Sequence, residues 1–190
     1  LSFCATNLVA QRSLSVSSPE ADNSVAAQLA SFQVAEGYEV NLFADESMGI
    51  ANPVCFRWDA EGRLWVLCTW AYPQLKPGEP ADDKLFILED KNQDGKADKV
   101  SVFADGLNMP TGFALGHGGV YLAEGSDFLH LRDTDSDGKA DQREVLFTGF
   151  GTGDTHQNIN SLTWSPGGEL FFCQGLHCFS RVQTPWGIAR

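Results

Sequence analysis

One pattern, a strand followed by a tight glycine turn and a second strand, recurs three times in this chain. The three stretches are CFRWDAEGRLWVLC (55–68), GFALGHGGVYLAEG (112–125) and SLTWSPGGELFFCQG (161–175). Short apolar or alternating runs that are broken by Gly, Pro, Asn and Asp predict β-strands. Because the pattern repeats along the chain, it also predicts a repeat architecture rather than a single irregular sheet.

Two further stretches connect these hairpins and resemble one another. They are KLFILEDKNQDGKADKVSVFADG (84–106) and FLHLRDTDSDGKADQREVLFTG (128–149), and each reads as two strands around an Asp-rich loop. Four-stranded units that are built from two hairpins and repeated around an axis are the blades of a β-propeller. We therefore predict an all-β chain whose residues 32–190 form a partial β-propeller of about three blade-like, four-stranded antiparallel units. Since a closed propeller needs about four to eight blades, we expect a fragment of a longer propeller.

Residues 1–31 precede this pattern; residues 11–31 are polar and small, with a short helix expected near 24–31. The apolar start LSFCATNLVAQ is consistent with the remnant of a signal peptide, which would make the protein exported, periplasmic or at the cell surface. The alternative is an arbitrary boundary with no targeting role.

Charge narrows the range of partners. The chain has 25 acidic and 13 basic residues and a formal net charge of -12, which repels phosphate backbones and anionic lipid surfaces. No run approaches the roughly 20 apolar residues that span a bilayer. We expect neither a nucleic-acid partner nor direct membrane insertion of this chain.

The stretch DTDSDGKADQRE (133–144) contains a calcium-type set of oxygen ligands. Positions 1, 3, 5, 9 and 12 of an EF-hand loop are taken by acidic residues, position 6 by Gly138, and position 7 by the carbonyl of Lys139. The acidic residues in that order are Asp133, Asp135, Asp137, Asp141 and Glu144. The flanks FLHLR and VLF favour strands, so we predict a Ca²⁺-binding hairpin turn and not an EF-hand. The alternative is a solvated acidic turn whose Asp and Gly residues serve only the turn.

A second loop, DKNQDGKAD (90–98), repeats this arrangement. Its candidate ligands are Asp90, Asn92, Asp94, the carbonyl of Lys96, and Asp98. Position 12 is Ser101, so the loop offers fewer carboxylates and is expected to bind Ca²⁺ more weakly.

Polar groups of the catalytic type gather in GFGTGDTHQNINSLTWSPGG (149–168), just before an apolar strand. In a propeller such loops meet at one rim, over a rigid scaffold. A neutral His156 can act there as a general base, oriented by Asp154 or Asn160. The alternative for His156 is a structural hydrogen bond within the loop.

Two resemblances add to this reading. HQNINSLTWSPGGELFFCQG is similar to a segment of the soluble sugar dehydrogenases of the glucose/sorbosone type that depend on pyrroloquinoline quinone (PQQ). That resemblance implies that His156 takes a proton from the substrate hydroxyl while hydride passes to the quinone. This chain has Ser161 where that family places an Arg.

The stretch from about residue 32 to 190 resembles more closely the N-terminal propeller of large, planctomycete-type membrane-bound dehydrogenase proteins. The matching stretches include NPVCFRWDAEGRLWV, GLNMPTGFALGHGGVYLAEG and LRDTDSDGKADQREVLFTGFGTGDTHQNIN. This resemblance implies a dehydrogenase that passes electrons to haem c in a domain outside this chain. We predict oxidation of a sugar or alcohol by a quinone such as PQQ, with Gln157, Asn158 and Arg57 as the candidate cofactor-binding residues. The alternative function is a non-catalytic, calcium-stabilised propeller that binds carbohydrate or protein through its rim.

Overall fold

A computed structural model describes residues 22–189, which divide into two units, 22–41 and 42–189. The first unit contains the helix α1 (Val25–Ser31), whose N-cap Ser24 accepts a hydrogen bond from the backbone N–H of Ala27 (3.2 Å). This is the short helix expected near 24–31. The sequence groups 32–41 with the propeller, whereas the structure places these residues in the first unit. The predicted signal-peptide remnant lies outside the described residues.

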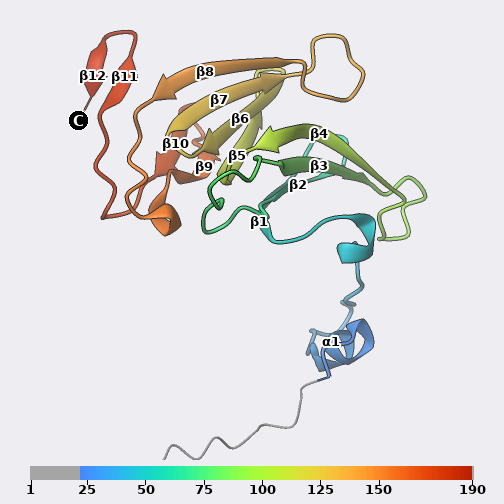
Figure 1. The fold of residues 1–190 in the computed structure, drawn as a ribbon. Coiled ribbons are helices and arrows are strands. Elements are labelled where there is room, and N and C mark those ends of the chain that lie inside the picture. Colours follow the sequence, from blue (N-terminus) through green and yellow to red (C-terminus); the bar gives the residue numbers. More distant parts are fainter. Residues whose placement is uncertain (1–21, 190) are drawn as a thin grey trace, which may run out of the picture. The chain divides into compact units, whose positions relative to one another are not determined.

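The second unit is built of antiparallel sheets, two large and one small, and none closes into a barrel (Figure 1). The first sheet has the order β1-β2-β3-β4, and the second has the order β12-β11-β8-β7-β6-β5. The third pairs β10 with β9. The strands of the first sheet are β1 (Pro53–Trp58), β2 (Leu64–Cys68), β3 (Asp83–Glu89) and β4 (Lys99–Leu107). Those of the others are β5 (Pro110–Gly116), β6 (Gly119–Glu124), β7 (Asp127–Arg132), β8 (Gln142–Thr148), β9 (Asn160–Trp164), β10 (Leu170–Cys173), β11 (Val182–Thr184) and β12 (Gly187–Ala189).

The predicted all-β class with blade-like units is confirmed. The three glycine-turn repeats are the hairpins β1–β2, β5–β6 and β9–β10, and the two Asp-rich stretches are the hairpins β3–β4 and β7–β8. The third unit is less complete than the other two. Its two strands form a separate sheet, and the hairpin β11–β12 extends the second sheet because Gln183 pairs with Thr148 at the edge of β8.

The first strands of the three glycine-turn hairpins lie beside one another, since β1 contacts β5 and β5 contacts β9. Side chains cross between them: Arg57 Nη2 donates to the carbonyl oxygen of Leu162 (3.2 Å), and Trp164 Nε1 donates to that of Leu115 (2.8 Å). A side chain at Gly116 would place its Cβ 2.7 Å from the Trp164 ring, so this crossing requires glycine. The three units therefore converge along their first strands.

The largest core lies between the first and second sheets. Alternate residues of each strand point to one face, and the facing positions of both sheets form one buried cluster. Its members are Trp65, Leu67, Leu85, Ile87, Phe103, Leu107, Phe113, Val120, Leu122, Leu129 and Leu131. Complete burial of a side chain of this size contributes roughly 1.5–3 kcal/mol to stability. The packing of one sheet on the next fixes where the loops at either end of the strands are held.

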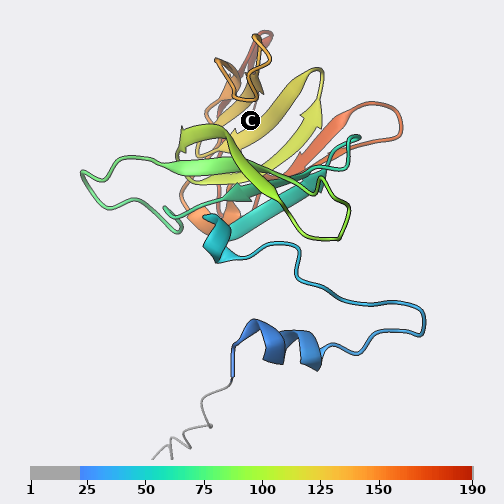
Figure 2. The same ribbon diagram turned by 90° about the vertical axis from the view of Figure 1, so that its right-hand side faces the viewer.

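These loops fall into two groups. At one end of the sheets lie the loops 90–98 and 133–141, on the right of Figure 1. At the opposite end lie the β2–β3 loop (69–82), the β4–β5 connection and the segment that leads to β9, which carries the short helix η2 (Thr155–Gln157). Figure 2 shows the β2–β3 loop projecting away from the first sheet. Another short helix, η1 (Glu46–Met48), precedes β1. The helices in the described part of the chain are all too short, or not apolar enough, to span a bilayer.

Candidate functional site

A small pocket of about 140 Å³ lies at the end of the sheets that carries η2, and we call it the rim pocket. It collects side chains from the β2–β3 loop, from the start of β5 and from the segment around η2. The residues that line it are Val54, Thr69, Tyr72, Met109, Pro110, Thr111, Thr155, His156, Asn158 and Asn160. His156, Asn158 and Asn160 were predicted from the sequence as site residues, so the fold brings these three together.

The position of His156 is set by Asp154. Asp154 caps η2: its Oδ1 accepts the backbone N–H of His156 (3.1 Å) and lies 3.2 Å from His156 Nδ1. Gln157 Nε2 donates to the other oxygen of Asp154 (2.9 Å), and Tyr72 meets the imidazole edge to face at 5.3 Å. A carboxylate accepts hydrogen bonds, so this contact assigns the imidazole proton to Nδ1 and leaves Nε2 as the nitrogen free of Asp154. The predicted orienting role of Asp154 has the geometry it needs.

The loop that follows β10 forms hydrogen bonds to this turn. The Gly175 N–H donates to the carbonyl oxygen of Gln157 (2.9 Å), and a Cβ at Gly175 would lie 2.2 Å from the Gln157 Cβ. The Cys178 thiol donates to the carbonyl oxygens of Gln157 (3.3 Å) and Asp154 (3.5 Å). The turn that carries His156 is therefore held from both of its ends.

Asn158 is the most unusual residue of the rim pocket. It is 1% exposed, and neither its amide nitrogen nor its amide oxygen has a hydrogen-bond partner among the described residues. Leaving a buried polar group unpaired costs about 1–3 kcal/mol, and native proteins rarely tolerate it without a bound molecule or water. Its backbone is well held, because Asn160 Nδ2 donates to the Asn158 carbonyl (2.8 Å). Both amide atoms have almost no accessible surface, so a polar group can reach them only where the lining of the rim pocket moves aside.

Asp83, at the start of β3, was missed by sequence reasoning. It is 1% exposed and accepts hydrogen bonds from the Thr69 hydroxyl (2.6 Å) and from the backbone N–H groups of Trp70 (2.6 Å), Ala71 (3.0 Å) and Met109 (2.9 Å). One carboxyl group thus fixes the β2–β3 loop and the β4–β5 connection, which both line the rim pocket. In the sequence only DDKLFILE points to it, and that run does not say which Asp is buried. Its neighbour Asp82 is exposed and pairs with Lys84 (2.7 Å).

The rim pocket does not match PQQ. PQQ is a large quinone with several carboxylates, whereas the described lining contains no Lys or Arg and its volume lies below the roughly 300–1,000 Å³ of ordinary cofactor sites. Arg57, a predicted cofactor residue, instead donates to the carbonyl oxygens of Phe56 (2.8 Å) and Leu162 (3.2 Å). Gln157 bonds to Asp154 and accepts from the His177 N–H (3.1 Å). Of the predicted cofactor residues, only Asn158 lines the pocket.

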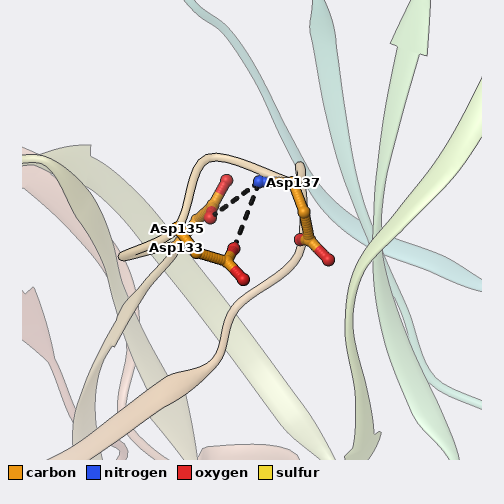
Figure 3. A group of neighbouring side chains, drawn as sticks. All are labelled: Asp133, Asp135 and Asp137. Carbon is orange, nitrogen blue, oxygen red and sulfur yellow. Dashed lines mark hydrogen bonds between the residues drawn. The ribbon is translucent and has the colours of Figure 1, made fainter.

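A group of three carboxylates lies at the opposite end, in the loop 133–141, which we call the second acidic loop. Asp133, Asp135 and Asp137 each offer an oxygen within 4.8 Å of the others. In Figure 3 the backbone nitrogen of Asp137 donates to Asp133 and Asp135, both at 3.2 Å. Asp133 also accepts from Ser136 (2.7 Å) and Gly138 (2.9 Å). Crowded carboxylates of this kind suit a hard divalent cation.

The remaining predicted ligands of this loop have other partners. Asp141 accepts the N–H (2.9 Å) and the hydroxyl (2.5 Å) of Thr134, and these bonds, the hydroxyl above all, lower its pKa. Lys139 donates its N–H to Asp137 (2.8 Å). Glu144 lies within β8, opposite His130, and pairs with Arg132 (3.2 Å). The structure therefore assembles three of the five predicted carboxylates.

The first acidic loop (90–98) is organised by its own amide. Asn92 Nδ2 donates to Asp94 (3.3 Å) and to Asp98 (3.2 Å), and Asp98 also accepts the N–H of Lys91 (2.7 Å). Asp90 accepts the N–H of Gly95 (2.9 Å), and the Lys96 N–H donates to Asp94 (2.9 Å). Both acidic loops join neighbouring antiparallel strands, which confirms that they are hairpin turns and not EF-hands.

Each acidic loop also donates a backbone hydrogen bond to a segment that lies earlier in the chain. The Ala140 N–H donates to the carbonyl oxygen of Phe103 in β4 (2.7 Å), and the Ala97 N–H donates to that of Phe43 (2.9 Å). Ala97 and Ala140 occupy the same position in the two loops. The loops are thus equivalent parts of a structural repeat.

Comparison with protein families shows what this chain is related to. Residues 24–186 match a family model that is described as a domain of unknown function, DUF7133. Searches of curated proteins and of solved structures find no match. The match spans most of the chain, so the chain belongs to the DUF7133 family.

Proposed function

We propose that this chain is part of a calcium-stabilised β-propeller that binds the hydroxyl groups of a carbohydrate in the rim pocket. The buried, unpaired amide of Asn158 carries this proposal. An amide offers both a donor and an acceptor, and a sugar hydroxyl needs both. Once the lining opens to admit a sugar, one or two of its hydroxyl groups can satisfy both halves of the Asn158 side chain.

The rest of the lining favours an uncharged ligand. Tyr72 supplies a hydroxyl group, and the hydroxyl oxygens of Thr69 and Thr111 remain acceptors although their protons are donated within the protein. The described lining has no Lys or Arg that could neutralise a phosphate or carboxylate. The net charge of -12 also disfavours anions at long range. A neutral polyol fits these conditions better than an anionic metabolite does.

Calcium fits the second acidic loop. Three carboxylates that share one turn repel each other, and a divalent cation among them removes that repulsion. Ca²⁺ would bind Asp133, Asp135 and Asp137 and would stabilise the β7–β8 hairpin. A weaker site at the first acidic loop remains part of the proposal, since Asn92 replaces one of the carboxylates there.

A dehydrogenase is the second candidate, and the Asp154–His156 pair is the observation that favours it. A histidine whose Nδ1 is held by a carboxyl group presents Nε2 as a general base, which could take the proton of a sugar hydroxyl. PQQ would supply the oxidant, but the described lining of the rim pocket gives it no site. Oxidation therefore requires cofactor residues other than those seen around His156.

Calorimetric titration with glucose and other monosaccharides tests the binding proposal. Asn158→Ala should weaken binding by about tenfold or more, since two hydrogen bonds of roughly 0.5–1.5 kcal/mol each are lost. The thermal unfolding midpoint of this variant should not fall, because the amide has no hydrogen-bond partner within the described protein. Asn23→Ala, in the first unit, is the control. Monosaccharide affinity that is unchanged in Asn158→Ala would refute the proposal.

Dye reduction with added PQQ and Ca²⁺ tests the second candidate. Sugar-dependent activity that disappears in His156→Ala and survives in His177→Ala would support a dehydrogenase. Sugar binding without any such activity would leave the binding function alone.

A further inference from the structure

A second and larger hollow adjoins the rim pocket. Its volume is about 600 Å³, and it is formed almost entirely by the β2–β3 loop. Tyr72 lines both hollows. The larger one is lined by residues 70–76, 79–80 and 82–84, and we call it the aromatic hollow. The two hollows therefore meet at one aromatic side chain.

Two aromatic rings in this hollow remain open to solvent. Trp70 and Tyr72 are each 44% exposed. Trp70 keeps this exposure although Phe86 meets its ring edge to face (6.2 Å) and the Lys84 ammonium lies 5.5 Å from its centroid. Large aromatic rings have an apolar body that is costly to leave in water. The C–H faces of a sugar ring can cover such a ring while the hydroxyl groups of the sugar stay hydrated.

The aromatic hollow is rigid at its base. The buried carboxyl group of Asp83 accepts hydrogen bonds from the backbone N–H groups of Trp70 and Ala71 and from the hydroxyl of Thr69. These bonds fix the backbone that carries the Trp70 ring. The same group also accepts from Met109 in the lining of the rim pocket. Both hollows are thus ordered by one anchor before any ligand arrives, which reduces the entropy that binding would otherwise cost.

Charge and size define the ligand. The two lysines of the aromatic hollow are paired with carboxylates of the chain, Lys84 with Asp82 (2.7 Å) and Lys76 with Glu79 (3.9 Å), which disfavours their use by an anionic ligand. The rim pocket alone is smaller than the roughly 300–1,000 Å³ of ordinary ligand sites, whereas the aromatic hollow falls within that range. A ligand that uses both must be neutral, elongated and rich in hydroxyl groups.

We infer that the rim pocket and the aromatic hollow form one extended site for an oligosaccharide. One sugar unit places its hydroxyl groups against Asn158, and the next unit stacks on Trp70 and Tyr72. This inference rests on the proposed carbohydrate-binding function and specifies its ligand class. Trp70 then determines the preference for chain length, while Asn158 determines whether any sugar binds.

The test compares glucose with maltotriose and cellotriose by calorimetric titration. The wild-type chain should bind at least one trimer about tenfold or more tightly than glucose. Trp70→Ala should remove this gain, so that the trimers bind no more tightly than glucose does, and Trp70→Phe, which keeps a smaller ring, should retain part of it. Trp186→Ala is the matched control, because Trp186 is 89% exposed and lies outside both hollows. Asn158→Ala should weaken the binding of glucose and trimer alike.

The outcomes separate this inference from the function on which it rests. If glucose binds and depends on Asn158, but the trimers gain nothing or keep their gain in Trp70→Ala and Trp70→Phe, the extended site is wrong and the proposed function stands. If neither glucose nor a trimer binds to the wild-type chain, both are wrong. The thermal unfolding midpoint of each variant shows whether a lost gain reflects a misfolded loop, and in that case Trp70→Phe decides.

Discussion

The two ends of the sheets differ in how similar their loops are between the first two units. At one end, the acidic loops DKNQDGKAD and DTDSDGKAD have equal length and join equivalent strands, and each donates one backbone bond to a Phe carbonyl. At the other end, the loop 69–82 joins β2 to β3, whereas only residues 125–126 join β6 to β7. The first end is alike in these two units, and we call it the repeated end; the second differs between them, and we call it the divergent end.

This difference separates structural from ligand-binding residues. Groups that recur in each unit serve the packing of units on one another, as Ala97 and Ala140 do. Asp83, His156 and Asn158 all lie at the divergent end. Binding sites in propellers and other scaffolds lie on such variable loops.

The largest effect on stability is expected from Asp83→Ala, which removes the hydrogen-bond acceptor that holds the loops at the divergent end together. The variant leaves the Thr69 hydroxyl and three backbone N–H groups without their acceptor. We expect the free energy of unfolding, measured by urea titration, to fall by about 3 kcal/mol or more. The control Asp82→Ala removes an exposed carboxylate and should change it by less than about 0.5 kcal/mol. Equal urea midpoints for the two variants would contradict the role of Asp83.

Calcium should act on the repeated end, which carries the two acidic loops. At a Ca²⁺ concentration near 100 times the Kd, binding to the folded state alone adds about 2.7 kcal/mol of stability. Chelation should therefore lower the unfolding midpoint, and Asp133→Asn should abolish most of this response. Asp90→Asn, in the first acidic loop, should reduce it far less, because Asn92 already pairs with carboxylates there. A wild-type midpoint that does not respond to chelation would rule out the calcium proposal.

A pH titration of stability tests the repeated end further, where Asp59 occupies the β1–β2 turn. Burial opposes ionisation of Asp59, but hydrogen bonds from the Trp65 indole and from Arg63 outweigh it and lower its pKa. Its contribution is complete above the ordinary Asp pKa and is lost as the pH falls through the lowered value. Asp59→Asn should cost about 1–2 kcal/mol at neutral pH and flatten the acid slope of the unfolding curve. Glu61→Gln, at a more exposed carboxylate of the same turn, is the control and should keep the slope.

The smallest effect concerns a single hydrogen bond in the second acidic loop. Thr134→Val removes the hydroxyl that donates to Asp141 and should raise the pKa of that carboxyl toward its ordinary value. Carboxyl-carbon chemical shifts, followed by NMR as a function of pH, would measure the change. An unaltered titration of Asp141 would mean that the backbone N–H of Thr134 alone sets its pKa.

Local pattern predicted much of the fold. The glycine turns and the β-prone flanks of the acidic loops are short-range signals, and the five hairpins that they predicted are present. Glu144 shows where a borrowed pattern fails. The backbone bond from Asp141 N–H to the Arg132 carbonyl (3.0 Å) closes the loop, and the strand that follows carries Glu144 away from the other carboxylates. In an EF-hand a helix would instead bring that position back.

The rest depends on contacts that are distant in sequence. Whether Asp82 or Asp83 is buried is decided by the position of β3 against the loop 69–71 and Met109. The Asn158 amide lacks a hydrogen-bond partner because of how the surrounding residues pack, and no sequence pattern predicts this. The position of the hairpin β11–β12 on β8 is likewise set by a free sheet edge and not by the repeat.

The backbone bonds of Ala97 and Ala140 have a consequence for cooperativity. Because they join main-chain atoms, no side-chain substitution at these positions, apart from proline, can delete them. Each loop can complete its bond only after the neighbouring Phe carbonyl is in place, so order in one sheet favours order in the next. Stability then spreads by nearest-neighbour coupling, as in linear repeat arrays, and local damage should weaken adjoining units first.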